Sequence, residues 1–217
     1  MDLIDQIDAL IRDRHLLSHP FYTRWREGTL PVEAIQEYTR QYYAFESAFP
    51  RLLSAIHSRT DDAVVRQSIL DNMWDEEHGT ANHAELWLRF AEGMGVERDE
   101  VREATPNPGT QALMDAYWDL AKNGSPAAAI AALYAYEAQV PEVAAEKIRG
   151  LRDRYGIDDA RTLAFFTVHS TLDLEHSEAE RDAIRRTTAT DGESEAARGA
   201  TSRALDAWWG FLDAVNV

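Results

Sequence analysis

The sequence contains no cysteine among its 217 residues. This absence excludes disulfides, thiolate catalysis, iron–sulfur clusters and cysteine-ligated zinc sites. Lysine is nearly absent as well, since Lys122 and Lys147 are the only two, against 20 arginines. This ratio is typical of an arginine-favouring proteome.

Long apolar runs are also missing. The longest wholly apolar run, Ala127–Tyr136, has ten residues and is too short to span a bilayer. The N-terminus, MDLIDQIDALIRDRH, is acidic and amphipathic, unlike a secretory signal with a basic start and an apolar centre. The net charge of -16 argues against a nucleic-acid partner and against an anionic membrane surface. We therefore predict a soluble cytoplasmic protein with no nucleic-acid or membrane partner.

Helical periodicity dominates the sequence, and no alternating strand pattern appears. A chain of this length can form one domain with a sizeable core, and the sequence contains no repeat. We predict a single all-α domain, residues 1–217, of about seven or eight helices. Its core spans about residues 2–186, the polar segment TTATDGESE at 187–195 is a linker, and an amphipathic helix follows at 196–215.

Two of the predicted helices carry an internal interruption. One starts near Thr60 and runs through a weak point at Gly79. Another follows the segment NGSP and is broken at Pro141. A third long helix, from about residue 158 to 186, contains no glycine or proline and is predicted to be continuous.

The segment HSTLDLEH lies inside this third helix. Because an α-helix advances about 100° per residue, steps of four and seven place His169, Asp173 and His176 on one face. Two imidazoles and a carboxylate on one face form either a solvated polar stripe or a set of metal ligands. The triplet alone leaves both interpretations open.

Two further polar positions need an explanation. Glu76 and His83 are seven residues apart and share one face if their helix is continuous, although such a pair alone is typical of an exposed surface. Glu137 is the only charged residue between Lys122 and Glu142, in a helix rich in Ala, Leu and Tyr. A buried carboxylate of this kind is stabilised by an arginine, by a tyrosine hydroxyl, or by a bound cation.

Taken together, separate helices supply three imidazoles and three carboxylates, with no thiol: Glu76, His83, Glu137, His169, Asp173 and His176. Ligands of this kind suit iron or manganese, and helix bundles commonly build dinuclear carboxylate sites. A single zinc ion needs fewer than six ligands. The sequence therefore predicts a dinuclear metal site.

Five segments of the chain resemble one protein family: RHLLSHPFYTRW, YYAFESAFPRLLSAIHSR, LDNMWDEEHGTANHAELW, AALYAYEAQVPEVAAEKIRGL and FFTVHSTLDLEH. The resemblance as a whole spans about residues 2–186, and these segments are its clearest parts. The family is the Chlamydia protein associating with death domains, which belongs to the haem-oxygenase-like dimetal oxidases and oxygenases. Its ligand pattern, Glu-x6-His, Tyr-Glu and His-x3-Asp-x2-His, matches the six residues above without a gap.

The resemblance implies a haem-oxygenase-like fold that binds two iron ions, or iron with manganese, instead of haem. It also implies O2 activation with an external reductant, and synthesis of 4-aminobenzoate for folate biosynthesis from the enzyme's own tyrosine. The family's tyrosine falls on Tyr22 of HPFY and its amino-donor lysine on Lys147, while Tyr136, beside Glu137, also matches. Without the resemblance, Tyr22 is an ordinary aromatic anchor and Lys147 an ordinary surface charge.

Three other functions are open at this stage. A dimetal oxygenase of the same fold could act on a free amino acid or a fatty acid. A cofactorless oxidase of the pyrroloquinoline-quinone type shares the fold, although such proteins lack this full set of ligands. The interaction role behind the family's name, binding of death domains, has no signal in this sequence. The sequence does not fix the oligomeric state, and a homodimer is one candidate.

Overall fold

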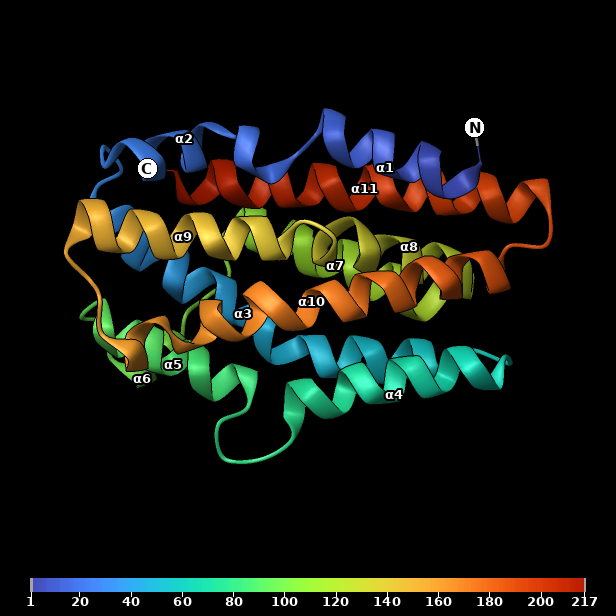
Figure 1. The fold of residues 1–217 in the computed structure, drawn as a ribbon, viewed down its shortest axis with the longest axis horizontal. Coiled ribbons are helices and arrows are strands. Elements are labelled where there is room, and N and C mark those ends of the chain that lie inside the picture. The colour runs from blue at the N-terminus through green and yellow to red at the C-terminus, as the bar shows by residue number, and fades with distance from the viewer. Residues whose placement is uncertain (1, 217) are drawn as a thin grey trace.

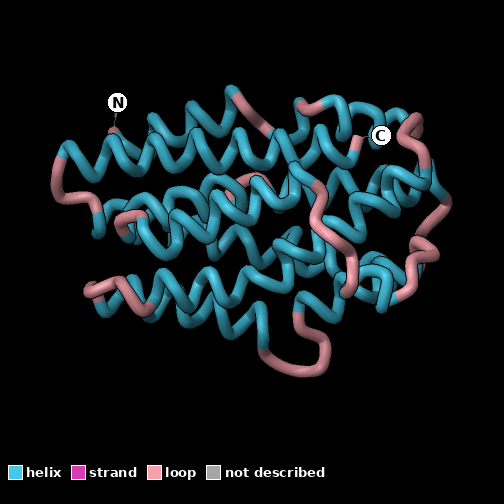
Figure 2. Tube along the Cα trace, turned by 180° about the vertical axis from the view of Figure 1, so that it is seen from behind, coloured by secondary structure: helices cyan, strands magenta, loops and turns pink. Residues whose placement is uncertain are grey.

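The computed structural model describes residues 2–216, without the side chains of residues 171–175 (Figure 1). Within these residues the chain forms helices and no strand (Figure 2), which confirms the predicted all-α class. The elements are α1 (Leu3–Asp13), the 3-10 helix η1 (Leu16–Ser18), α2 (Pro20–Glu27), α3 (Val32–His57), α4 (Ala63–Glu77), α5 (His83–Gly93), α6 (Arg98–Arg102), α7 (Pro108–Asn123), α8 (Pro126–Glu137), α9 (Val140–Tyr155), α10 (Ala160–Thr187) and α11 (Asp191–Val215).

Most helices begin where local side-chain chemistry favours a start. In eight of the α-helices the N-cap side chain accepts a hydrogen bond from a backbone N–H of the first turn. These caps are Asp2, His19, Asp62, Asn82, Asn107, Ser125, Asp159 and Thr190. Proline lies in the first turn of α2, α7, α8 and α9. Backbone N–H groups in the first turn make no hydrogen bond within the helix, so the lack of an N–H on proline costs nothing there. Such starts are encoded locally, so the sequence predicts them well.

The long helices lie alongside one another in one bundle (Figures 1 and 2). α3 packs against α4, α5 and α7, and α10 packs against α4, α5, α8 and α9. α11 runs beside α1 and packs against α7 and α8. Helices that are distant in the sequence therefore surround one interior, and the candidate site lies in it.

This interior is rich in aromatic side chains. Trp25, Tyr38, Trp87 and Trp208 are each at most 2% exposed. Trp208 of α11 stacks on Tyr136 of α8 with ring centroids 4.2 Å apart. The last helix therefore belongs to the same core as the rest of the chain.

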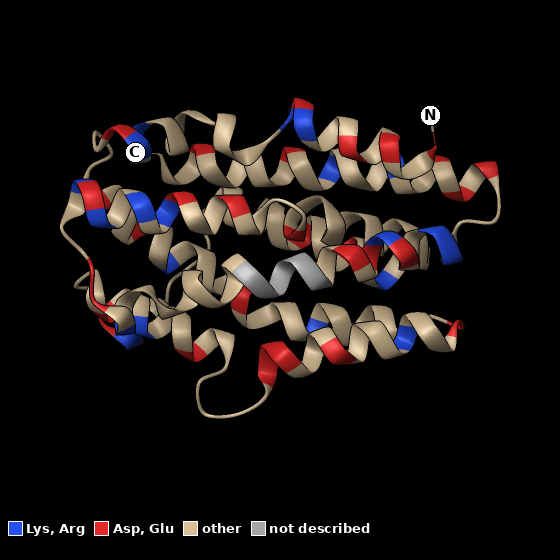
Figure 3. Cartoon of the chain, in the orientation of Figure 1, with Lys and Arg blue, Asp and Glu red and all other residues tan. Residues whose placement is uncertain are grey.

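Acidic residues outnumber basic ones, 38 to 22. Most charged residues lie along the outer faces of the helices, while a few, such as Glu137 and Lys147, are buried (Figure 3). The negative charge of the chain is thus spread over several helices in this view. No helix in the described part of the chain combines the length and the apolar character needed to cross a membrane.

Both predicted interruptions divide a helix in two. α4 ends at Glu77 and α5 begins at His83, so the weak point at Gly79 is a complete break. Gly79 has a φ of 85°, a left-handed conformation that glycine adopts without strain. The helix with Pro141 divides just before it, between α8 and α9. These two breaks and the short α6 raise the number of helices above the predicted seven or eight.

The polar linker is shorter than predicted and the last helix is longer. α10 continues to Thr187 and α11 begins at Asp191, in place of the predicted linker at 187–195 and helix start at 196. Thr190 and Glu193 form a capping box, in which each side chain accepts a hydrogen bond from the other residue's backbone N–H. This cap starts the helix within a segment whose polar composition suggested a loop.

Candidate metal centre

Three buried ligand-type side chains converge from α4, α5 and α10. They are Glu76 in the last turn of α4, His83 at the start of α5 and His169 in the middle of α10. One potential ligand atom from each lies within 4.8 Å of the others, and each residue is at most 6% exposed. The His83 Nδ1 and Glu76 Oε2 atoms are 2.9 Å apart. The surface interpretation of these residues is therefore wrong.

The break between α4 and α5 produces this arrangement. The predicted face-sharing of Glu76 and His83 assumed a continuous helix, and that assumption is wrong. The chain instead leaves α4 after Glu77, turns at Gly79 and restarts at Asn82, whose side chain accepts a hydrogen bond from the Glu85 N–H. His83 thus lies at the first position of a new helix, and its imidazole meets the Glu76 carboxylate from a separate element.

The chemistry of this group fits a redox metal. Two imidazoles and one carboxylate are the ligand set of many non-haem iron sites, which leave further coordination positions open. The His169 Nδ1 atom lies 2.8 Å from the Phe165 carbonyl oxygen. A carbonyl only accepts hydrogen bonds, so Nδ1 carries the proton and Nε2 has its lone pair available for a metal. Burial, reinforced by the nearby His83, holds the pKa of His169 well below its ordinary value, so this imidazole is neutral.

Glu137 lies beside this group. It is the last residue of α8, is 2% exposed, and accepts hydrogen bonds from the Asn72 side-chain amide at 3.1 and 3.3 Å. An amide is therefore one partner of this carboxylate, for which the sequence analysis allowed an arginine, a tyrosine hydroxyl or a bound cation. Glu137, Glu76 and His169 line one small internal cavity of about 10 Å³.

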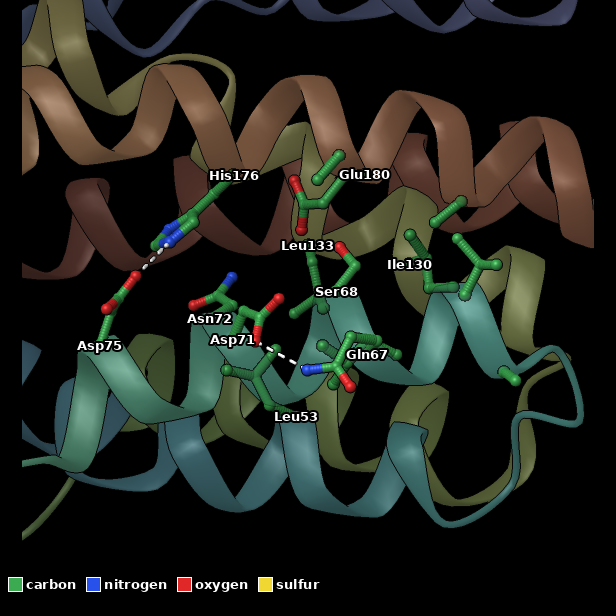
Figure 4. Close-up of a pocket in the computed structure, with 15 residues that line it drawn as sticks. Leu53, Gln67, Ser68, Asp71, Asn72, Asp75, Ile130, Leu133, His176 and Glu180 are labelled. Carbon is green, nitrogen blue, oxygen red and sulfur yellow. Dashed lines mark hydrogen bonds and ion pairs between the residues drawn. The ribbon is translucent and has the colours of Figure 1, made fainter.

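The remaining two predicted ligands are on α10. His176 is 8% exposed, and its Nε2 lies 3.1 Å from the Asp75 Oδ2 atom (Figure 4). The side chain of Asp173 lies outside the described residues. The structure thus brings Glu76, His83 and His169 together with Glu137 beside them, while His176 contacts a carboxylate that the sequence analysis missed.

Tyr22 and Lys147 meet in the same interior. Tyr22 is 2% exposed and Lys147 is 4% exposed, so Lys147 is not a surface charge. The Lys147 Nζ donates a hydrogen bond of 2.5 Å to the Tyr38 hydroxyl and lies 5.7 Å from the Tyr22 ring centroid. Tyr22 and Tyr38 also share a side-chain hydrogen bond. We call Tyr22, Tyr38 and Lys147 the tyrosine–lysine cluster.

Burial changes the protonation of this cluster. Desolvation lowers the pKa of Lys147 to about 7, although the nearby Glu46 carboxylate partly opposes the change. A substantial fraction of this amine is therefore neutral at physiological pH, and only a neutral amine has a lone pair to donate. Desolvation also raises the pKa of Tyr22, so its phenol stays protonated.

Tyr42 and Tyr136 connect the tyrosine–lysine cluster with the cavity. Their hydroxyls are 2.6 Å apart, and the Tyr42 ring centroid lies 5.6 Å from the Lys147 Nζ. Both tyrosines and Glu46 line the small cavity that Glu76, Glu137 and His169 also line. The candidate metal ligands and the candidate substrate residues therefore belong to one continuous buried site.

The sequence analysis missed Tyr38, Tyr42 and Glu46. All three are on α3 at intervals of four residues, which places them on one helical face. Glu46 is 4% exposed, and its carboxylate within an otherwise aromatic stripe is the signal that could have identified it. Asp75 and Asn72 gave no such signal, because acidic and amide residues are ordinary at the surface of a helix.

A family model described as iron-containing redox enzyme matches residues 36–209. The chain belongs to this family. The matched range contains all six predicted ligands, and the carboxylate and the two imidazoles that converge among them have a chemistry that suits a metal ion.

Similar proteins include a synthase of 4-aminobenzoate and, at lower identity, a synthase of pyrroloquinoline-quinone. The 4-aminobenzoate synthase of Chlamydia muridarum is 40% identical, with 98% of this chain and 89% of that protein covered. The pyrroloquinoline-quinone synthase of Acidiphilium cryptum is more distant, at 26% identity over 98% of this chain and 89% of that protein. The resemblance predicted from the sequence segments is therefore confirmed.

Solved structures confirm the haem-oxygenase-like fold. A protein from Shewanella denitrificans, described as having a heme oxygenase-like fold, superposes with a TM-score of 0.83 at 17% identity, covering 99% of this chain and 92% of that one. The identity is too low to say more than that the two chains share a fold.

Proposed function

We propose that this protein is a 4-aminobenzoate synthase that takes the aromatic ring from Tyr22 and the nitrogen from Lys147. The observation that carries the proposal is the burial of both residues in one cluster, which adjoins the candidate metal ligands through Tyr42 and Tyr136. The 40% identity to a protein of that name over nearly the whole chain supports it.

The proposed cofactor is a pair of iron ions, or iron with manganese, bound by Glu76, His83, Glu137, His169, Asp173 and His176. Such a metal pair, when bound, activates O2 with electrons from an external reductant and oxidises a nearby phenol. The buried donor set supports this choice, because two imidazoles and a carboxylate lie within 4.8 Å of one another in a site that excludes solvent.

Comparing tyrosine with 4-aminobenzoate defines what must happen to Tyr22. Its Cα–Cβ bond breaks with Cα left on the chain, O2 oxidises Cβ to the carboxyl carbon with oxygen from O2 or water, and the phenol oxygen leaves as water when nitrogen replaces it. Lys147 is placed to supply that nitrogen, with cleavage of its own Cε–Nζ bond, because its Nζ lies over the Tyr22 ring, 5.7 Å from the centroid, and its lowered pKa favours the neutral amine. Tyr38 orients both residues through hydrogen bonds to each.

The test follows the labelled ring into the product and examines the nitrogen donor by substitution of Lys147. Protein that carries ring-labelled tyrosine should release labelled 4-aminobenzoate when it is loaded with iron and manganese and given O2 and a reductant. Tyr22→Phe and Lys147→Arg should release none, since phenylalanine lacks the hydroxyl and a guanidinium stays charged. Tyr43→Phe and Lys122→Arg are the matched controls, because Tyr43 is outside the cluster and Lys122 is exposed, and both should retain product formation.

An unlabelled product, or an intact Tyr22 in protein that has formed product, would contradict self-consumption. That result would favour an oxygenase of the same family that acts on a free substrate. Growth of a strain unable to make 4-aminobenzoate, without supplement, tests the activity in cells. A cytoplasmic location and a homodimer stay predictions from the sequence.

A further inference from the structure

A groove of about 580 Å³ lies between α4, α8 and α10, next to His176 (Figure 4). Its volume is in the range of small-molecule binding sites in proteins. Tyr22, Tyr38 and Lys147 are not among its lining residues, so it is separate from the tyrosine–lysine cluster.

The walls of the groove are mainly aliphatic. Leu53, Ile69, Ile130 and Leu133 contribute from α3, α4 and α8, and Ala179 contributes from α10. Small side chains such as Ala179 leave room between the helices. These walls favour the apolar body of a ligand, because its burial removes apolar surface from water.

The polar lining of the groove includes three carboxylates beside the side chains of Gln67, Ser68, Asn72 and His176. Asp71, Asp75 and Glu180 line it, and Glu180 is 7% exposed. In Figure 4 the Glu180 carboxylate extends from α10 toward Ser68 on α4. Among the described residues that line the groove, none is a lysine or an arginine. The groove therefore disfavours an anion and favours a cation.

The side-chain oxygen of Asn72 is a buried acceptor that a hydrogen-bond donor on the ligand could satisfy. Asn72 is 5% exposed, and its Nδ2 donates to the Glu137 carboxylate, which fixes the direction of the amide. No group in the described part of the chain donates a hydrogen bond to its buried Oδ1 atom. Because a buried acceptor without a donor destabilises the protein, a ligand with an N–H group would be favoured there.

We propose that this groove binds a small primary amine in its ammonium form, with an apolar body of alkyl or aryl-alkyl type. The ammonium group has three donors, which suit the Asn72 Oδ1 and the Glu180 carboxylate, and the apolar body lies along Ile130 and Leu133. The bound amine would sit beside the His176–Asp75 pair, at the outer side of the candidate metal centre. This binding site goes beyond the proposed function and does not depend on it.

Calorimetric titration of the metal-loaded protein at pH 7 tests the ligand class. Hexylamine should bind at least tenfold more tightly than hexanol, which has the same body without the charge, and than ammonium chloride, which has the charge without the body. Hexanoate should show no binding. Hexanoate binding as tight as hexylamine, or ammonium chloride binding as tight as hexylamine, would overturn the proposal.

Variants on α10 test the location. Glu180→Gln should weaken hexylamine binding at least tenfold, and Ala179→Leu should weaken it similarly by filling the groove. Glu178→Gln is the matched control, since it removes one charge from an exposed position of the same helix, and it should change affinity less than twofold. Equal affinity of the Glu180→Gln and Glu178→Gln proteins, each with native circular dichroism, would show that the amine binds elsewhere.

Discussion

The Lys147 side chain extends from α9 into an aromatic interior, where its Nζ lies 4.7 Å from the Tyr38 ring centroid and 5.1 Å from that of Phe166. Ring faces attract a cation, but they replace only part of the hydration that an ammonium group loses on burial. The Tyr38 hydroxyl accepts one hydrogen bond, and Glu46 is the nearby carboxylate that favours the charged form. The loss of hydration outweighs these favourable contacts, so the neutral form of the Lys147 amine is more favoured here than it is in water.

This environment predicts a pH dependence of stability. Burial lowers the pKa of Lys147 from 10.5 to about 7, so between these values the unfolded chain binds a proton that the folded chain does not. The free energy of unfolding therefore rises with pH in this window, by up to roughly 1.4 kcal/mol per pH unit from this residue. Lys147→Met should abolish that rise, as measured by urea unfolding of the metal-free protein between pH 7.5 and 9.5.

The exposed lysine provides the comparison. Lys122→Met should leave the pH dependence as in the unsubstituted protein, because Lys122 is at the surface. If Lys147→Met and the unsubstituted protein have parallel pH profiles, Lys147 is not the group that loses its proton on folding.

Residue types and spacing predicted much of the candidate site. His169 and His176 were singled out because a helix places them on one face, and Glu137 because a charge within an apolar helix needs a partner, while their role as metal ligands stays a prediction. Asn72 and Asp75 could not be identified in this way. Their roles depend on contacts with Glu137 and His176, 65 and 101 residues away in the sequence, which no local pattern encodes.

At the scale of elements, α2 and α9 carry Tyr22 and Lys147 and are held together by one tight contact. A Cβ atom at Gly150 of α9 would lie 2.4 Å from the Trp25 indole of α2, so only glycine fits without a shift. The indole N–H also donates to the Lys147 carbonyl at 3.4 Å. The distance between the candidate substrate residues is thus fixed by helix packing as well as by their own contacts.

Gly150→Ala should therefore separate α2 from α9. We expect a loss of about 1 to 3 kcal/mol in the free energy of unfolding, since Trp25 is fully buried and cannot move aside easily. Product formation should fall as well, because Tyr22 and Lys147 move apart. Urea unfolding and a product assay measure the two effects.

Gly199→Ala on α11 is the control. Its Cβ would meet nothing within 4 Å, so it should stabilise the protein by about 0.5 to 1 kcal/mol through the better helix propensity of alanine. Equal effects of the two substitutions would mean that Gly150 is an ordinary helical glycine.

The helices themselves were more predictable than their exact ends. Caps and prolines are local signals, so most starts were found, whereas the break after Glu77 appeared only as a weakness at Gly79. A single glycine within a helix usually costs about 1 kcal/mol without ending it. Here the N-cap Asn82 starts a new helix shortly after Gly79, so the chain forms two helices. The new helix places His83 in a buried position, a tertiary contact that the local sequence does not show.

For the whole molecule, metal binding should be coupled to folding. The candidate ligands come from α4, α5, α8 and α10, which meet only in the folded bundle. Iron or manganese should therefore stabilise the folded state, by about 2.7 kcal/mol at a free metal concentration one hundred times the Kd. Calorimetry should show a higher Tm with Mn²⁺ under anaerobic conditions, and a chelator should reverse the increase.

His83→Ala tests whether the stabilisation comes from this site. The variant should lose most of the Tm increase, because one of three close ligands is missing. An equal increase in both proteins would assign the effect to metal bound elsewhere on this acidic surface.

The burial of Tyr22 has a consequence for the lifetime of the protein. Its ring packs against Phe21, with centroids 5.2 Å apart, and almost none of it is exposed. A chain that has given up this ring keeps a cavity in its core, and removal of a buried aromatic side chain typically costs about 3 to 5 kcal/mol. Against a total stability of about 5 to 15 kcal/mol, such a chain unfolds far more often and is open to proteases. The reaction would thus destabilise the spent chain enough for proteases to degrade it, and its amino acids would return to protein synthesis.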